Sequence, residues 1–258
     1  MKLTFLGTGT SFGVPVVGCE CDVCRSDDPR NRRTRHGLLL EGASGTLLVD
    51  TPPELRLQLV AARATRVDAV FLTHPHADHV HGIDDLRVFA VHGRSSLPVH
   101  VAARYEAELR RRFDYFLGPD ASSQPGTSIP GIELVLFDDR DEIEAAGFLL
   151  RTIAFPHGEF ESYGFRTGDL AVVVDAKRVP EDAWDLLSGV RTLVINALWF
   201  GRKHPTHFTV EDAVEVAERL GAERTWLTHL THEVEYSDAL QRLPAAVRPA
   251  YDGLTVEV

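Results

Sequence analysis

The stretch THPHADHVHG at residues 73–82 follows directly on a short apolar run. Four side chains that can bind metal ions fall within six of its residues, namely His74, His76, Asp78 and His79. Alternate side chains of an extended chain point the same way, so His74 and His76 can reach one ion. After a turn, Asp78 and His79 can face a second ion beside the first. Imidazole and carboxylate suit Zn²⁺, Mn²⁺ or Fe²⁺. The competing interpretation is a polar loop with a chance cluster of histidines.

Ligand-type side chains also follow three later apolar runs. His157 comes after LLRTIAFP, Asp175 after LAVVV and His229 after TWLT. Strand ends are rigid, and the loops that leave them are where catalytic and binding residues concentrate. Together with His74, these residues predict one site at which four strand ends converge.

The chain mixes short runs typical of strands with longer patterns typical of helices. Apolar, β-branched runs indicate strands, among them residues 3–6, 46–49, 69–72, 132–137 and 192–195. Helical patterns lie between such runs, among them residues 53–63, 80–90, 104–116 and 210–220. This mixture predicts a layered α/β protein with helices on the outer faces of its sheets. No internal repeat or interdomain linker is evident, so residues 1–258 are expected to form a single domain.

The composition is that of an ordinary globular protein, with 44% hydrophobic and 25% charged residues. The formal net charge of −11 disfavours loose binding to nucleic acid, because phosphate contacts need a basic surface. Two bound divalent cations would make a site locally positive, so a small anionic substrate remains compatible. The sequence shows no secretory signal and no run long enough to span a membrane, so we expect a cytoplasmic protein.

The HxHxDH pattern after a strand resembles the signature of the metallo-β-lactamase superfamily, whose αββα sandwich carries two metal ions at one edge. The resemblance implies that His74, His76 and His157 hold one ion, that Asp78, His79 and His229 hold the other, and that Asp175 bridges them. Position 76 is His where the oxygen-reducing diiron branch usually has Glu, which favours hydrolysis over redox chemistry. The expected fold is therefore an α/β, metallo-β-lactamase-like αββα sandwich that spans nearly the whole chain.

A narrower resemblance concerns both ends of the chain. The opening LGTGTSFGVPVVGCECDVC and the later LTHLTH look like the phosphoribosyl cyclic phosphate phosphodiesterases of phosphonate degradation. The resemblance implies a structural zinc ion held by Cys19, Cys21, Cys24 and His232. Structural zinc takes four ligands, and three cysteines without a leader argue against a disulfide framework. The alternative is three inert cysteines. The resemblance also implies a small cyclic phosphate substrate, such as 5-phosphoribosyl 1,2-cyclic phosphate, and a homodimer.

His207 is the candidate general acid. It lies just before Thr209, the expected N-cap of the helical pattern 210–220, whose N-terminus favours a phosphate nearby. In the resembling phosphodiesterases a histidine before this helix is thought to protonate the leaving oxygen, and His207 matches its place. His204 is a rival, and a merely structural role at the helix start is the alternative. In the implied mechanism two ions, zinc or manganese, supply hydroxide that attacks phosphorus, and His207 protonates the departing alkoxide.

Two smaller features support the same site. Asp50 follows the expected strand 46–49 and is expected to accept a hydrogen bond beside the ligands or to form a turn. Gly7, Gly9 and Gly13 do not have the spacing of a dinucleotide-binding motif, so we expect them to form a tight loop under the metal site.

Three other functions remain compatible with these residues. A nuclease that processes RNA or tRNA would need a basic surface or a projecting arm, and the acidic composition shows neither clearly. A thioesterase or lactonase would make His207 dispensable for many leaving groups. A non-catalytic protein resembling cofactor-biosynthesis proteins would share the Cys-x-Cys-x-x-Cys opening, but such proteins commonly lack part of the dinuclear ligand set.

Overall fold

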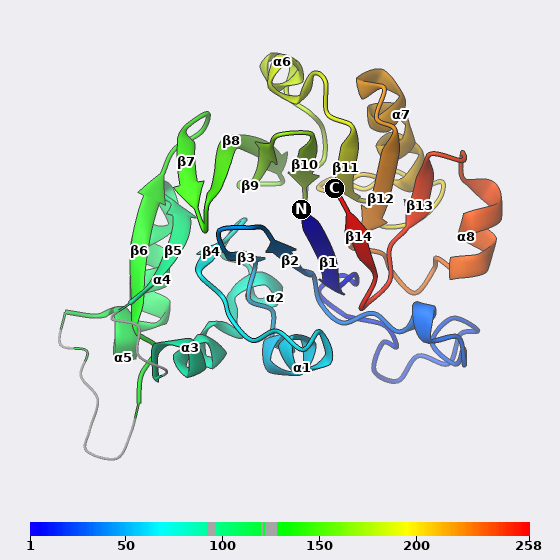
Figure 1. Ribbon diagram of the computed structural model, residues 1–258. Helices are drawn as coiled ribbons and strands as arrows, with labels where there is room; N and C mark the ends of the chain where they lie inside the picture. Colours follow the sequence, from blue (N-terminus) through cyan, green and yellow to red (C-terminus); the bar gives the residue numbers. More distant parts are fainter. Residues whose placement is uncertain (92–95, 120, 122–127) are drawn as a thin grey trace.

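Two mixed seven-stranded sheets form the centre of the computed structural model, which describes residues 1–91, 96–119, 121 and 128–258 (Figure 1). In spatial order the first sheet consists of β14 (Thr255–Glu257), β1 (Lys2–Gly7), β2 (Gly37–Glu41), β3 (Thr46–Val49), β4 (Ala69–Phe71), β5 (Leu97–Ala102) and β6 (Ile132–Phe137). The second consists of β13 (Val247–Pro249), β12 (Arg224–Thr228), β11 (Thr192–Asn196), β10 (Leu170–Val173), β9 (Phe160–Thr167), β8 (Phe148–His157) and β7 (Glu142–Ala145).

Helices enclose the two sheets from outside (Figure 1). The first sheet is accompanied by α1 (Leu55–Ala61), α2 (Ala77–Val80), α3 (Arg87–Val91), α4 (Glu106–Arg112) and α5 (Asp114–Leu117). The second is accompanied by α6 (Trp184–Leu187), α7 (Val210–Leu220) and α8 (Tyr236–Arg242). Short 3₁₀ turns are η1 (Pro29–Asn31), η2 (Ile83–Leu86), η3 (Ala103–Tyr105) and η4 (Glu181–Ala183). The predicted αββα sandwich is confirmed.

The central strands β10 and β11 of the second sheet bury side chains on both faces. In β10, Leu170 and Val172 join the core between the sheets, whereas Ala171 and Val173 join the core under the outer helices. Successive side chains of a strand point to opposite faces, so a strand covered on both sides is apolar throughout. This burial explains why β10 reads as an unbroken apolar run and why its end is a rigid support for the residue that follows.

The helix α7 has the predicted bounds and the predicted cap. The Thr209 hydroxyl accepts from the backbone N–H of Asp212, whose carboxylate accepts from the backbone N–H of Thr209. This reciprocal capping box satisfies N–H groups that a helix start otherwise leaves without partners. Gly221 ends the helix in the left-handed conformation, at φ 66°.

Two other helix predictions were wrong. The pattern 104–116 is divided into η3, α4 and α5, because Phe113 leaves helical geometry at φ −118° and ψ 44°. The pattern 80–90 is divided into α2, η2 and α3, because Gly82 leaves helical geometry at φ −93° and ψ 5°. A Cβ at this position would sit 2.0 Å from the Pro52 carbonyl oxygen, so only glycine fits. Within the described ranges, every helix is too short or too polar to cross a bilayer.

Candidate metal centre

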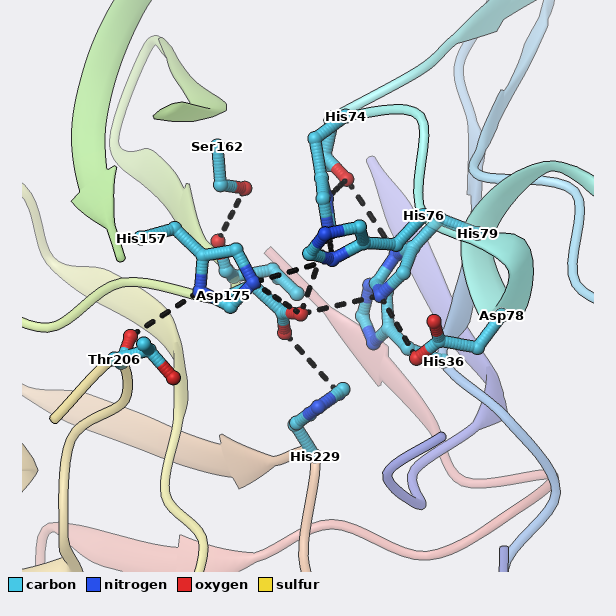
Figure 2. Close-up of polar contacts among 12 residues, drawn as sticks. His36, His74, His76, Asp78, His79, His157, Ser162, Asp175, Thr206 and His229 are labelled. Atoms are coloured by element: carbon cyan, nitrogen blue, oxygen red, sulfur yellow. Dashed lines mark hydrogen bonds and ion pairs between the residues drawn. The ribbon is translucent and has the colours of Figure 1, made fainter. Parts of the chain in front are cut away.

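The predicted ligands lie together at one edge of the sandwich (Figure 2). They come from the segment after β4, the start of α2, and the ends of β8, β10 and β12. The side chains brought together in this way are His74, His76, Asp78, His79, His157, Asp175 and His229. The expectation that four strand ends converge on one site is therefore met.

Several strand ends turn sharply where they enter the site. Asp50, Asp175 and His229 have positive φ angles of 62°, 53° and 58°. Non-glycine residues avoid this left-handed region, at a cost on the order of 1–3 kcal/mol each, and such conformations concentrate at functional sites. Each of these turns ends a buried strand and directs a carboxylate or imidazole into the same small volume.

The carboxylate of Asp175 stands at the centre of the cluster (Figure 2). Its Oδ2 lies 3.6 Å from Nε2 of His74 and 3.3 Å from Nε2 of His79. Its Oδ1 lies 3.2 Å from Nδ1 of His229. One carboxylate thus faces imidazoles from both halves of the ligand set, which is the arrangement that a bridging ligand requires.

Three imidazoles form the first half of the set. Nδ1 of His76 lies 2.8 Å from Nε2 of His74 and 3.3 Å from Nε2 of His157. Ligand nitrogens about 2.0–2.1 Å from a tetrahedral zinc ion stand about 3.3 Å apart. The spacing of these three nitrogens therefore fits one shared ion.

The second half joins a carboxylate to two imidazoles. Oδ2 of Asp78 lies 3.3 Å from Nε2 of His79, and Asp78, Asp175 and His229 also form a compact ligand group. Nε2 of His79, Nδ1 of His229 and Oδ1 of Asp175 are buried and have no hydrogen-bond partner among the described residues. Buried polar atoms without partners are costly, and a divalent cation would satisfy all three, so the donor set fits such an ion.

Burial and charge act in opposite directions on these groups. Burial lowers the pKa of His74 well below its usual value and lowers that of His229 to about 3, so both rings are neutral. For His79 burial has the same effect, but Asp78, Asp50 and Asp175 outweigh it and raise its pKa well above the usual value. A cation bound here would take over the neutralisation of these carboxylates and release the proton from His79.

Hydrogen bonds on the far side of each ring orient the ligands. Nδ1 of His79 donates to Oδ2 of Asp50 at 2.7 Å, and the Thr73 hydroxyl donates to the same carboxylate while facing Nδ1 of His74 at 3.0 Å. Nδ1 of His157 donates to the carbonyl of Thr206 at 3.2 Å. These partners fix the tautomer in which the opposite nitrogen is free for a metal ion. The supporting role expected of Asp50 is confirmed.

Replacing Asp50 by asparagine is expected to weaken metal binding in the pocket roughly 10–100-fold, the usual effect of losing a partner that orients a ligand. The amide keeps the size of the side chain but removes the charge that holds the proton on Nδ1 of His79. Titration with Zn²⁺ or Mn²⁺ against a competing chelator measures the change. Exposed Asp238, which pairs with Arg242 on α8, provides the matched control Asp238→Asn, for which unchanged affinity is expected. Equal affinities for both variants would contradict the orienting role.

His207 contacts the ligand cluster directly, whereas His204 contacts His207. Nε2 of His207 is 3.5 Å from Oδ2 of Asp175 and has no hydrogen-bond partner among the described residues. His204 contacts Nδ1 of His207 at 3.3 Å and belongs to none of the ligand groups found in the described chain. The geometry therefore favours His207 over its rival as the group next to a substrate. His207 also forms a compact group with His157 and Asp175, so a role as metal ligand competes with a role as acid.

The three cysteines meet a histidine from the other end of the chain. Nδ1 of His232 lies 3.2, 3.5 and 3.6 Å from the sulfurs of Cys19, Cys21 and Cys24. A tetrahedral zinc ion with usual bond lengths separates a sulfur and a nitrogen ligand by about 3.6 Å. The backbone N–H of Cys24 helps to lower the pKa of Cys21 to about 6, so this thiol readily supplies a thiolate. The predicted set of four therefore fits one structural zinc ion.

A buried arginine ties the two parts of this cluster together. Arg33 is 1% exposed and donates to the carbonyls of Thr231 and Val234, at 3.0 and 2.8 Å, on either side of His232. Its backbone pairs with Val14, in the segment that leads to the cysteines. This role could not be predicted from the sequence, because Arg33 stands among other arginines and a buried arginine cannot be told from an exposed one there.

The variants Cys21→Ser and His232→Ala are each expected to lose about one zinc ion per chain, because either change leaves the structural site one ligand short. Their thermal unfolding midpoints should fall, since structural zinc contributes directly to folding. Metal analysis by mass spectrometry gives the stoichiometry. The control is His81→Ala, an exposed histidine outside the described ligand groups. Full zinc content in both variants would exclude the site.

A cavity of about 630 Å³ gives access to the cluster. Its floor contains His76, Asp78, His157, Asp175, His207 and His229. Gly7 is the last residue of β1 rather than part of the expected loop, and the loop with Gly9 and Gly13 contributes Thr10 to the wall of the cavity. His232 also lines the cavity, so the cysteine cluster supports one side of the pocket.

An αββα sandwich with histidines and carboxylates at this edge is typical of metal-dependent hydrolases. A family model described as a beta-lactamase superfamily domain matches residues 46–230. The chain belongs to the metallo-β-lactamase superfamily, and it is a hydrolase of that superfamily whose fold implies binding of divalent metal ions. The resemblance inferred from the HxHxDH pattern is confirmed.

Three proteins that are similar to this chain have names that describe different activities. The crystal structure of a new diphosphatase from the PhnP family superposes with a TM-score of 0.90 at 33% identity, covering 100% of this chain and 97% of that one. An octanoyltransferase of Porphyromonas gingivalis is 34% identical over 98% of this chain, which spans about half (51%) of that protein's length. A ribonuclease Z of Myxococcus xanthus is 28% identical, covering 100% of this chain and 98% of that protein.

Proposed function

We propose that the chain hydrolyses a phosphoric diester with two divalent ions, zinc or manganese, and that its substrate is a small anionic cyclic phosphate. An example of such a substrate is 5-phosphoribosyl 1,2-cyclic phosphate. The observation that carries the proposal is the complete ligand set around Asp175, with His207 facing the same carboxylate. The similarity to a PhnP-family diphosphatase, at 33% identity over the whole chain, supports chemistry at phosphorus.

The residues of the site would have the following roles in binding metal ions. His74, His76 and His157 would hold one ion, and Asp78, His79 and His229 the other, with Asp175 between them. Two ions in this place would lower the pKa of a bound water and draw charge from the phosphoryl oxygens. Cys19, Cys21, Cys24 and His232 would hold a structural zinc ion beside the pocket.

His207 would hold a proton on Nε2 and donate it to the leaving oxygen. The N-terminus of α7 has a smaller part than the sequence suggested. The N–H groups of Thr209 and Asp212 bond within the capping box, and that of Val210 donates to the Trp199 carbonyl. Lys177 and Lys203 both contact the Asp212 carboxylate. Because these donors are occupied, we expect His207 and the ions to supply the main contacts to a phosphate.

A second candidate is hydrolysis of an acyl ester or thioester. Apolar side chains such as Val16 and Leu198 line the cavity, and the octanoyltransferase of Porphyromonas gingivalis is similar over almost all of this chain. A ribonuclease function is disfavoured, because the described wall of the cavity has no lysine or arginine to contact an RNA backbone. We propose a homodimer on the resemblance alone.

Two substrates with the same leaving group separate the candidates. Bis(p-nitrophenyl) phosphate and p-nitrophenyl octanoate both release p-nitrophenol, so their rates compare attack at phosphorus with attack at an acyl carbon. We expect the metal-loaded chain to cleave the phosphate, to stop when a chelator is added, and to recover with Zn²⁺ or Mn²⁺. Cleavage of the octanoate alone would overturn the proposal in favour of the acyl ester.

A further inference from the structure

The cavity above the ligands has a rim of exposed aromatic side chains. Phe12 is 73% exposed and Phe160 is 40% exposed, and both line the cavity that contains the ligands. Large aromatic side chains are normally buried, and their exposure beside a pocket marks a place where a ligand is contacted.

Both phenyl rings are held by rigid backbone. Phe160 lies directly opposite His157 in the β8–β9 hairpin, so both side chains leave the same face of the sheet toward the ligands. The hairpin turn begins at Gly158, which has φ 65° and leaves no room for a Cβ, since one would meet Thr206 Cγ2 at 2.9 Å. The Phe160 ring packs edge-on against His76, with centroids 4.9 Å apart.

Phe12 lies in a tight turn at residues 10–13, in a different segment of the chain from the β8–β9 hairpin. The turn is closed by a hydrogen bond from the Gly13 N–H to the Thr10 carbonyl at 2.8 Å. The Arg35 guanidinium donates to the Ser11 carbonyl at 3.0 Å and braces the turn from outside. These bonds hold the backbone from which the exposed ring projects, so a ligand need not order this turn when it binds.

The charged residues of the cavity wall indicate which kind of ligand the cavity can bind. Among the residues described, the wall includes Glu159 and Glu233 but no lysine or arginine. Arg202 lies near the rim, but it stacks on Trp199 at 3.9 Å and pairs with Glu233 at 2.7 Å. A second phosphate on the substrate would find no lysine or arginine among the described residues of this wall, whereas an uncharged ring would find the exposed faces of two phenyl rings.

We propose that Phe12 and Phe160 form a binding site for a planar, uncharged ring of the substrate, of nucleobase chemistry, while its phosphate lies on the ligand cluster. The proposal rests on the proposed function for the position of the phosphate. It narrows the substrate to phosphate esters that carry such a ring. Within the proposed function, a cyclic phosphate of a nucleoside therefore takes precedence over 5-phosphoribosyl 1,2-cyclic phosphate, which has a second phosphate group and no base.

Binding of two matched ligands to the metal-loaded chain tests the site. Adenosine 5′-monophosphate and ribose 5-phosphate share sugar and phosphate and differ in the adenine ring, and calorimetry measures both affinities. Stacking of one base on an aromatic side chain is worth roughly 5- to 150-fold in affinity, so we expect adenosine 5′-monophosphate to bind at least about tenfold more tightly. Equal affinities would overturn the proposal.

Variants then assign the effect to the two rings. Phe12→Ala and Phe160→Ala should each lower the affinity for adenosine 5′-monophosphate by roughly fivefold or more and leave ribose 5-phosphate within about twofold. Phe160→Tyr should keep the wild-type preference, since it retains a flat ring. The control Leu149→Ala removes a side chain that is 57% exposed and lies outside the cavity wall, and no change is expected. Equal losses for both ligands would contradict the stacking role and assign Phe160 to packing on His76.

The outcome is independent of the catalytic assay. A chain that prefers the adenine ligand but cleaves no phosphodiester would retain the aromatic site and refute the proposed function. A chain that cleaves cyclic phosphates but binds both ligands equally would retain the function and refute the aromatic site.

Discussion

Replacing Asp175 by alanine is expected to remove both ions from the pocket and to slow phosphodiester cleavage by more than about a thousandfold, because metal ions carry most of the charge stabilisation in such sites. Asp175 faces His74, His79 and His229 within 3.6 Å, so no other carboxylate can replace it between the two halves of the ligand set. His229, His79 and His207 outweigh the effect of burial and hold the pKa of Asp175 well below its usual range, so it is ionised and ready to bind cations.

Metal analysis and activity are to be measured on the same preparations of Asp175→Ala. The structural zinc should remain, so the metal content should fall from about three ions per chain to about one. The matched control is Asp169→Ala, an exposed aspartate in the turn between β9 and β10 whose partner is Arg191 at 3.7 Å. That variant should keep both metal and activity. An unchanged metal content in Asp175→Ala would contradict the bridging role.

Replacing His207 by alanine is expected to slow substrates with poor leaving groups by roughly 10²–10⁴-fold, the usual contribution of a general acid. Bis(p-nitrophenyl) phosphate should be affected far less, because p-nitrophenolate departs without protonation. The metal content should remain that of the wild type. Rates for a ribose cyclic phosphate and the aryl ester, measured side by side, give the ratio that reports on the acid.

His204→Ala is the control for this prediction. His204 contacts His207 and belongs to none of the described ligand groups, so its loss should have a much smaller effect on the same ratio. Equal slowing of both substrates by His207→Ala would count against a general acid. Loss of an ion in that variant would instead make His207 a ligand together with His157 and Asp175.

The ligands at strand ends were the easiest to predict from the sequence. The strand β10 is buried on both faces and apolar throughout, so Asp175 after it stands out. The strand β8 exposes Leu149 and Arg151, and His157 stands out because the last part of that strand is apolar. The histidine beside the cysteines was predicted from the family resemblance, because no local pattern connects Cys19 with His232 across more than 200 residues.

Other elements could not be predicted because tertiary contacts form them. The strand β9 reads FESYGFRT, which mixes charges with a glycine, and its register is set by β8 and β10. A Cβ at Gly164 would sit 2.1 Å from the Val172 carbonyl oxygen, so this glycine serves close packing rather than a turn. The rim formed by Phe12 and Phe160 escaped notice for the same reason, because only the fold brings these residues to one cavity.

Anomalous diffraction from crystals of the zinc-loaded chain would locate every bound ion. We expect two peaks about 3.5–4 Å apart on either side of the Asp175 carboxylate. We expect a third peak among Cys19, Cys21, Cys24 and His232. A single peak beside Asp175 would contradict the dinuclear site, and no peak there would contradict metal-dependent hydrolysis by this chain.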